Sequence, residues 1–398
     1  MTSASARFRA LFALWLLLGL ALSSWVTRTP AVRDALGAST AEMGLLFFAL
    51  SAGSMAGILA CPPLVRRFGT NRVIPSTLIA WIGGTFAIGA GAALGSPLLV
   101  GAGLAALGAG MGSTEIAFNI DGAEVERLLG RPILPFLHGA FSIGAVIGGL
   151  SGIWFTSIDL PPAAQLIGAA LVAVAVSLTA LGTLRQPFGV LHGDGAAASG
   201  APAWRESRVL RIALIVLVLT LAEGTANDWL PLVMVDGHGL AQSTSSVVYT
   251  VFAASMAVGR LTGPFVLARV PRVAVVAASA GFAVLGLLGA MFAPTVALAY
   301  VAATLWGLGA ALAFPVSISA AAEGDPATAA GRVSVIATSG YLGFLVGPPM
   351  LGLLGEHYGL RQALVIVLVL VLVAIVLAPA VRPVGASPSN TPAQKEPA

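Results

Sequence analysis

A segment of this chain occurs twice, about 200 residues apart, inside apolar stretches long enough to cross a lipid bilayer. Ser54–Ala56 returns as Ser255–Ala257, and both copies lead into short turns that contain arginine. The same spacing relates Glu124 to Glu323. Duplicated multi-helix halves in a membrane are typical of secondary transporters, in which two bundles move about a site between them. The repeat therefore favours two similar membrane bundles with a solute site at their interface.

The composition places the chain in lipid, because only 9% of its residues are charged and 58% are hydrophobic. Basic residues are dispersed through short loops, which argues against nucleic acid as a partner. The single cysteine, Cys61, excludes an internal disulfide. No metal cluster, nucleophile–base set or phosphate-binding loop is found in the sequence, so neither an enzyme nor an ATP-driven pump is expected. We expect a monomer without a cofactor, energised by the proton gradient.

Twelve apolar runs have the length of about 20 residues that a helix needs to span the hydrocarbon. These runs predict an all-α fold of two pseudo-twofold-related six-helix bundles. The predicted spans are 8–29, 40–61, 72–94, 97–120, 133–157, 163–184, 209–230, 244–267, 272–293, 296–321, 332–355 and 361–381.

The domain boundaries follow from the same pattern. Residues 1–184 form the predicted N-terminal bundle and 209–382 the C-terminal bundle, with a cytoplasmic linker at 185–208 and a disordered tail at 383–398. With the N-terminus inside, only Arg28, Arg33 and Arg361 of the 20 basic residues lie outside, and Arg260 lies within a span. The positive-inside rule therefore predicts that both termini are cytoplasmic.

Charged residues within spans are few, and each is a candidate functional residue because a buried charge is costly in a membrane. Glu115 and Asn119 are spaced i, i+4 on one face of the fourth span, and Glu223 and Asn227 repeat this spacing in the seventh. A carboxyl beside a carboxamide suits a site that binds a polar solute together with a proton. The alternative is a structural hydrogen bond between helices.

Further candidates lie near these pairs. His138 is a possible proton relay or a structural imidazole, and Arg260 is an anchor for an anionic solute or a partner of Glu223. Arg28 and Asp228 are predicted to form an ion pair that closes the outer side, with pairing inside one half as the alternative. The aromatic candidates for lining the cavity are Trp25, Trp229 and Tyr341.

The short turns on the cytoplasmic side carry charges of opposite sign. Basic turns follow spans two and eight, whereas acidic turns follow spans four and ten. They predict a latch that closes this side, with solvated surface charge as the alternative. The predicted gating residues in these turns are Arg66, Arg67, Glu124, Arg269, Arg272, Glu323 and Arg332.

The chain resembles the major facilitator superfamily along its whole length, on the two six-helix halves and the basic turn after span two. That family's turn reads Gly-x-x-x-Asp-Arg-x-Gly-Arg. Arg67 and Gly69 match it here, whereas Arg66 occupies the aspartate position. The resemblance implies alternating access to a site near mid-membrane.

Three segments are similar to the YbjJ-type inner-membrane proteins of bacteria: Ser24–Pro30, Glu223–Pro231 and Val235–Gly239. This resemblance implies a multi-pass protein of the bacterial inner membrane. Glu115-x-x-x-Asn119 resembles the fourth-span motif of fucose–proton symporters, in which the acid takes part in proton coupling and sugar binding. The acid that those symporters carry in the first span has no counterpart here.

The expected function is secondary active transport of a small polar solute, and proton symport is the favoured mechanism. Proton-coupling residues would be Glu115, Glu223 and His138. The predicted solute-binding residues are Trp25, Arg28, Glu115, Asn119, Glu223, Asn227, Asp228, Trp229, Arg260 and Tyr341. Two alternatives remain open, namely proton-antiport efflux of drugs or metabolites and a sensor or scaffold that does not transport.

Overall fold

The computed structural model describes residues 4–131, 133–184, 203–323 and 326–383. Within these ranges, 12 helices are long and apolar enough to cross a membrane, as predicted. The N-terminal half consists of α1 (Ala4–Thr27), α2 (Thr29–Leu36), α3 (Thr40–Phe68), α4 (Thr70–Leu94), α5 (Pro97–Leu129), α6 (Leu134–Ser157) and α7 (Pro162–Leu184). The C-terminal half consists of η1 (Ala203–Arg205), α8 (Ser207–Leu232), η2 (Val233–Gly237), α9 (Gln242–Leu267), α10 (Arg272–Phe292), α11 (Val296–Ala321), α12 (Pro326–Tyr358), α13 (Leu360–Leu377) and η3 (Ala378–Val381).

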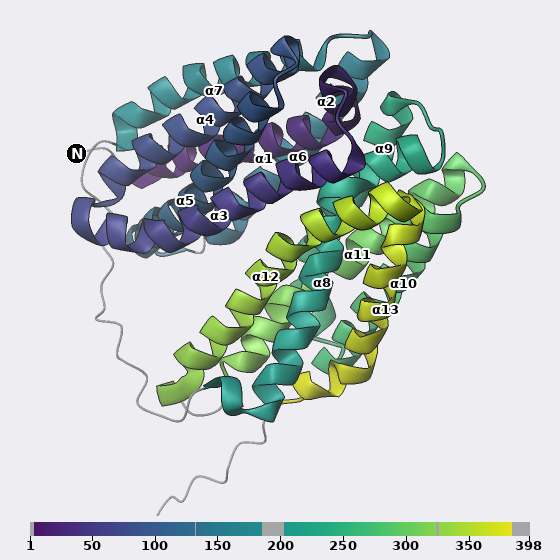
Figure 1. The fold of residues 1–398 in the computed structure, drawn as a ribbon. Helices are drawn as coiled ribbons and strands as arrows, with labels where there is room; N and C mark the ends of the chain where they lie inside the picture. Colours follow the sequence, from purple (N-terminus) through teal and green to yellow (C-terminus); the bar gives the residue numbers. More distant parts are fainter. Residues whose placement is uncertain (1–3, 132, 185–202, 324–325, 384–398) are drawn as a thin grey trace, which may run out of the picture.

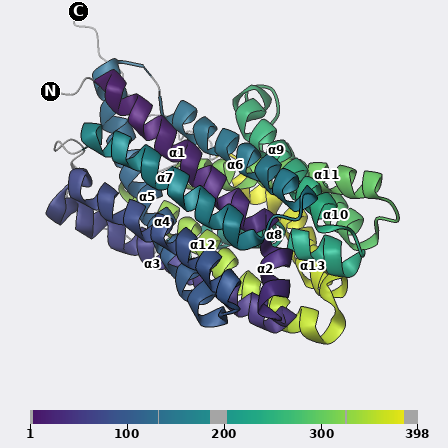
Figure 2. The ribbon, with the colours of Figure 1, turned by 90° about the horizontal axis from the view of Figure 1, so that it is seen from above.

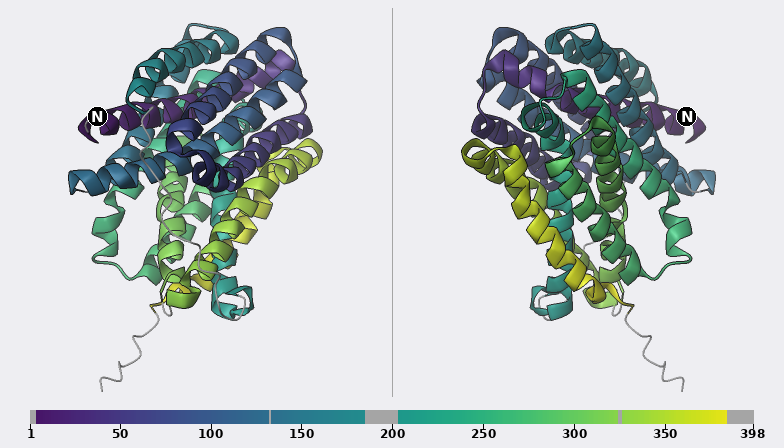
Figure 3. Two further views of the ribbon diagram at one scale, coloured as in Figure 1. Left: turned by 90° about the vertical axis from the view of Figure 1, so that its left-hand side faces the viewer. Right: turned by 90° about the vertical axis from the view of Figure 1, so that its right-hand side faces the viewer.

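The two halves are separate bundles that lie against one another (Figure 1). Figure 3 shows the same division from two other sides, and in Figure 2, seen from above, the N-terminal bundle lies in front of part of the C-terminal one. Across the division, α3 packs against α12 and α6 packs against α9. We call the side where α1 begins the terminal side and the opposite side the far side. The predicted linker 185–208 and tail 383–398 fall largely outside the described residues.

Three helices continue past the predicted spans on the terminal side. Helix α3 runs to Phe68, α5 runs to Leu129 and α12 already begins at Pro326. The apolar pattern stops at the first charges, whereas a helix ends where its backbone is capped. Gly130 at the end of α5 has a left-handed φ of 63°, a conformation that glycine adopts without steric cost.

Short helix α2 was not predicted, because its 8 residues are too few for a periodic signal. Its boundaries have ordinary local causes. Pro30 occupies the first turn, where its missing N–H is not needed, and Gly37 ends the helix with a φ of 62°. The next helix, α3, starts with a capping box in which Ser39 and Glu42 each bond the other's backbone N–H. These signals fix the chain reversal on the far side.

Glycines let helices within each half approach closely, as their i, i+4 spacing predicts. A Cβ atom added to Gly108 on α5 would lie 2.0 Å from the Leu50 carbonyl oxygen on α3. One added to Gly144 on α6 would lie 1.8 Å from the Leu16 carbonyl oxygen on α1. Neither site can hold a larger residue without moving a helix, so these glycines set the packing of the N-terminal half.

Candidate functional site

Charged side chains of both halves meet at the interface on the terminal side of the spans. Arg260 on α9 donates from Nη2 to Oε1 of Glu223 on α8 at 2.9 Å. Glu115 on α5, from the other half, lies within electrostatic range of Arg260. The side chains of Glu115 and Arg260 are both exposed although they lie inside spans. Their electrostatic interaction brings charged groups of both halves into one region of the interface.

The structure answers the question that the sequence left open about Arg260. Its guanidinium is 45% exposed but is held by Glu223, whose side chain is only 12% exposed. Arg260 is therefore partnered within the C-terminal half, and Glu115 and His138 of the N-terminal half lie within electrostatic range of it. The Arg260 guanidinium thus interacts with two acidic side chains, Glu223 of its own half and Glu115 of the other.

Asn119 and His138 extend this cluster within the N-terminal half. One helical turn after Glu115, the Asn119 Oδ1 atom lies 3.1 Å from His138 Nε2 on α6. The His138 ring packs on Trp15 of α1 with ring centroids 4.7 Å apart. His138 is exposed and lies within electrostatic range of Arg260. Glu115 and Asn119 share one face of α5, and this face lies at the interface.

On the C-terminal half, Tyr341 of α12 is half-buried and lies within electrostatic range of Glu115. Tyr249 of α9 donates its hydroxyl to Asn227 Oδ1 at 3.3 Å, and it lies close to Glu223 and Asp228. Tyr249 was not predicted, because one tyrosine in an apolar helix resembles ordinary core. Through this hydrogen bond Tyr249 of α9 connects to Asn227 of α8.

The predicted ion pair between Arg28 and Asp228 is wrong for this conformation. Arg28 is buried and donates to the Thr156 hydroxyl and to the Leu160 carbonyl oxygen, both in its own half. Within the described part of the chain, no hydrogen bond or salt bridge engages the Asp228 carboxylate. The repeat predicted that both residues lie near the far ends of equivalent spans, but it did not predict the direction of either side chain.

The prediction that Trp25 and Trp229 line a cavity is also wrong for this conformation. Both are only 1% exposed. Phe47 of α3 lies between them, with ring centroids 6.2 Å from Trp25 and 5.0 Å from Trp229. These three rings form an aromatic cluster, contributed by both halves, that closes the interface on the far side of the polar site.

The far side is closed by polar contacts between the halves. Arg33 of α2 forms an ion pair with Asp236 of η2. Glu356 accepts from the Ala41 backbone N–H at 3.1 Å, and Gln242 donates to Asp34 Oδ2 at 2.9 Å. Partial burial disfavours the charged guanidinium, but the carboxylates of Asp236 and Asp34 raise the pKa of Arg33 above its ordinary value. Arg33 therefore remains a cation in this contact.

The charged turns of the terminal side pair within each half in this conformation. Glu124 bonds Arg127 on the same helix, and Glu323 forms an ion pair with Arg272. Arg332 bonds Glu206 at 3.0 Å, and Arg269 donates to the carbonyl oxygen of Phe265 at 3.0 Å. The remaining predicted latch residues, Arg66 and Arg67, are exposed. A latch between the halves stays a prediction for another conformation.

A further buried network in the N-terminal half was not predicted as a pair. Arg7 donates to Asp121 from Nε at 2.7 Å and from Nη2 at 2.9 Å, and the Thr70 hydroxyl adds a bond of 2.9 Å. The two charged side chains are 1% and 0% exposed.

No group of three or more His, Cys, Asp or Glu side chains that could hold a metal ion occurs in the described ranges.

Residues 135–341 match the Major Facilitator Superfamily model. The chain belongs to this superfamily. It is therefore a multi-pass membrane transporter and not an enzyme.

Relatives along almost the whole chain agree with this assignment. An uncharacterized transporter of Sinorhizobium fredii, y4wD, is 29% identical over 94% of this chain and 98% of its own length. An uncharacterized MFS-type transporter of Yersinia pestis is 28% identical over 87% of this chain and 88% of its own. Membrane protein MosC of Rhizobium meliloti is 26% identical over 88% of this chain and 84% of its own.

Solved superfamily structures have the same fold at low sequence identity. The nucleoside transporter NupG aligns with a TM-score of 0.75 at 17% identity, covering 94% of this chain and 98% of its own. An inward-facing, unoccupied bacterial homolog of the lysosomal transporter Spinster gives 0.75 at 17% identity over 96% and 99%. The Escherichia coli fucose:proton symporter gives 0.61 at 18% identity over 95% and 98%.

Proposed function

We propose that this transporter carries a small polar solute together with protons by alternating access, with Glu115 as the coupling carboxyl. The observation that carries the proposal is that Glu115 of one half lies within electrostatic range of Arg260, which is paired with Glu223 in the other half. A carboxylate opposite a guanidinium attracts the two halves toward one another, and a protonated carboxyl does not. Proton binding at Glu115 therefore changes the free energy of closing the terminal side.

The arrangement of the interface supports an inward-open state. The far side is closed by the Arg33–Asp236 ion pair and the aromatic cluster, whereas Glu115, His138 and Arg260 are exposed on the terminal side. We place the terminal side in the cytoplasm of a bacterium, in agreement with the distribution of basic residues. The protein would then act as a monomer in the inner membrane, driven by the proton gradient rather than by a bound cofactor.

The chemistry of the cluster supports a solute with several hydrogen-bonding groups. Asn119 and Asn227 offer both donors and acceptors, and Tyr341 adds a hydroxyl. His138 packed on Trp15 presents an aromatic edge beside these groups. Nucleosides and fucose, the solutes for which two structural neighbours are named, are rational first probes of this site. Nucleic acid does not enter the proposal.

The decisive experiment is transport in proteoliposomes with an imposed pH gradient. Symport predicts that a gradient of about one pH unit drives about tenfold accumulation for each coupled proton. Glu115→Gln, which cannot release a proton, is expected to abolish this accumulation while exchange of labelled solute for unlabelled solute continues. Asp159→Asn is the matched control, because Asp159 is an exposed carboxyl between α6 and α7 that belongs neither to the candidate site nor to the predicted latch.

The outcomes separate the alternatives. Solute accumulation when the interior is the more acidic side would indicate antiport. No transport of a solute that demonstrably binds would indicate a protein that does not transport. If Glu115→Gln accumulates solute like the wild type at every pH gradient, Glu115 is not the coupling group and the proposal fails.

A further inference from the structure

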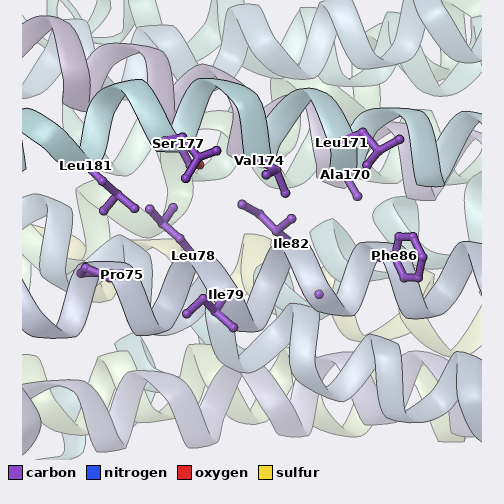
Figure 4. A pocket seen from close by; sticks show the side chains of 12 residues that line it. Pro75, Leu78, Ile79, Ile82, Phe86, Ala170, Leu171, Val174, Ser177 and Leu181 are labelled. Atoms are coloured by element: carbon purple, nitrogen blue, oxygen red, sulfur yellow. The ribbon is translucent and has the colours of Figure 1, made fainter.

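An apolar groove follows the outer surface of the N-terminal half between α4 and α7, away from the interface (Figure 4). It encloses about 380 Å³. Ile79, Ile82 and Phe86 line it from α4, and Leu171 and Val174 line it from α7. The lining is almost entirely aliphatic and aromatic, so the groove is made for an apolar occupant.

The groove is open to the membrane rather than filled by the protein. Ile79 and Leu171 are 75% and 59% exposed. Gly83 is one of the lining residues, and a Cβ atom added there would meet nothing within 4 Å. In a bilayer, the hydrocarbon of neighbouring lipids is the apolar material that reaches such a surface.

The length of the groove is close to the thickness of one leaflet. From Pro75 to Phe86 it follows about three turns of α4, which is roughly 17 Å at about 1.5 Å per residue. This is about half of the 30 Å hydrocarbon thickness. Pro75 and Leu181 mark one end, and both lie within two turns of the terminal-side ends of their helices. The groove therefore begins near the terminal-side ends of α4 and α7 and reaches past the middle of both helices, a length that one acyl chain can occupy.

A cation lies where the headgroup of such a lipid would be. Arg72 precedes Pro75 by three residues, and the series Arg72, Pro75, Ile79, Ile82 and Phe86 recurs at the i, i+3, i+7 spacing of one helix face. Arg72 is exposed, and in the part of the chain that the structure describes no hydrogen bond or ion pair engages its guanidinium. It is free to bind a phosphate.

We propose that this groove is a binding site for one anionic phospholipid of the terminal-side leaflet. One acyl chain lies between α4 and α7, and the headgroup phosphate pairs with Arg72. The site is independent of the transport site, because its lining residues come from α4 and α7 alone. An anionic lipid at this position would stabilise the packing of α7 on the N-terminal half.

The test measures lipid retention by the full chain, using native mass spectrometry of detergent-purified, delipidated protein with added dioleoyl phosphatidylglycerol or phosphatidylcholine. The wild type is expected to retain one phosphatidylglycerol. Gly83→Leu fills the groove and is expected to lose retention of both lipids. Arg72→Gln is expected to keep phosphatidylcholine but to lower the preference for phosphatidylglycerol by about fivefold.

Gly281→Leu is the matched control, since Gly281 on α10 of the other half also faces open space. It is expected to retain lipid like the wild type. Phosphatidylglycerol with a photoreactive diazirine in its acyl chain provides a second readout on the unmodified protein, with labelled peptides expected from α4 and α7. Retention by Gly83→Leu at the wild-type level, labelling confined to other helices, or a dimer joined through this groove would each overturn the proposal.

Discussion

The buried ion pair between Arg7 and Asp121 makes a quantitative prediction about stability. The Asp121 carboxylate accepts two bonds from Arg7 and one from Thr70, and neither charged side chain is more than 1% exposed. Arg7→Met leaves a buried carboxylate with only the Thr70 hydroxyl. Removing one partner of a buried pair costs about 3 to 5 kcal/mol, because the remaining charge is uncompensated.

The double variant separates this explanation from simple loss of packing. Arg7→Met combined with Asp121→Leu removes both charges and keeps apolar volume, so its stability is expected to equal or exceed that of the wild type. Unfolding in mixed micelles with increasing dodecyl sulfate, followed by circular dichroism, measures each free energy of the cycle. Arg9→Met is the control, because Arg9 is exposed on the same helix.

Two results would refute the reasoning. One is that Arg7→Met unfolds at the same denaturant concentration as Arg9→Met, which would mean that the buried pair is not engaged in the membrane protein. The other is that the double variant is less stable than the wild type, which would mean that the pair contributes more than its desolvation costs.

Two further predictions concern the closed far side, and both are read from the alkylation rate of a cysteine introduced behind the aromatic cluster. Arg33→Glu places a negative charge beside the Asp236 carboxylate and is expected to increase the alkylation rate. The double variant Arg33→Glu with Asp236→Arg is expected to restore the wild-type rate. An unchanged rate in the single variant would contradict the role of this pair. Gly44→Val is expected to wedge the halves apart, since an added Cβ atom would lie 2.9 Å from the backbone of α12, whereas Gly168→Val projects into open space and leaves the rate unchanged. Equal rates in these two glycine variants would show that the close approach does not hold the seal.

The helices were predictable because each depends on a local property of the sequence. Apolar length alone located 12 spans, and helix ends differed where charges interrupt the apolar pattern before the cap, as at Gly130. Helix α2 was missed because 8 residues carry too little periodicity.

The candidate site was predictable only in part, through residues whose charge is costly in free energy inside a membrane span. Charges in spans are rare, so Glu115, Glu223 and Arg260 could be selected without a structure. Their partners could not, since spacing predicts a helix face but not which neighbouring helix it meets. Arg28 illustrates the difference, because a hydroxyl and a carbonyl oxygen in its own half bind it instead of Asp228.

The contact between Phe47 and Trp229 gives this transporter an intrinsic optical reporter. Trp229 is one of 7 tryptophans, and it is shielded from solvent by a ring that belongs to the opposite half. Any rotation that parts the halves on the far side hydrates this indole and shifts its emission to longer wavelength. Turnover can therefore be followed by fluorescence in unlabelled protein, provided that the other tryptophans are replaced by phenylalanine.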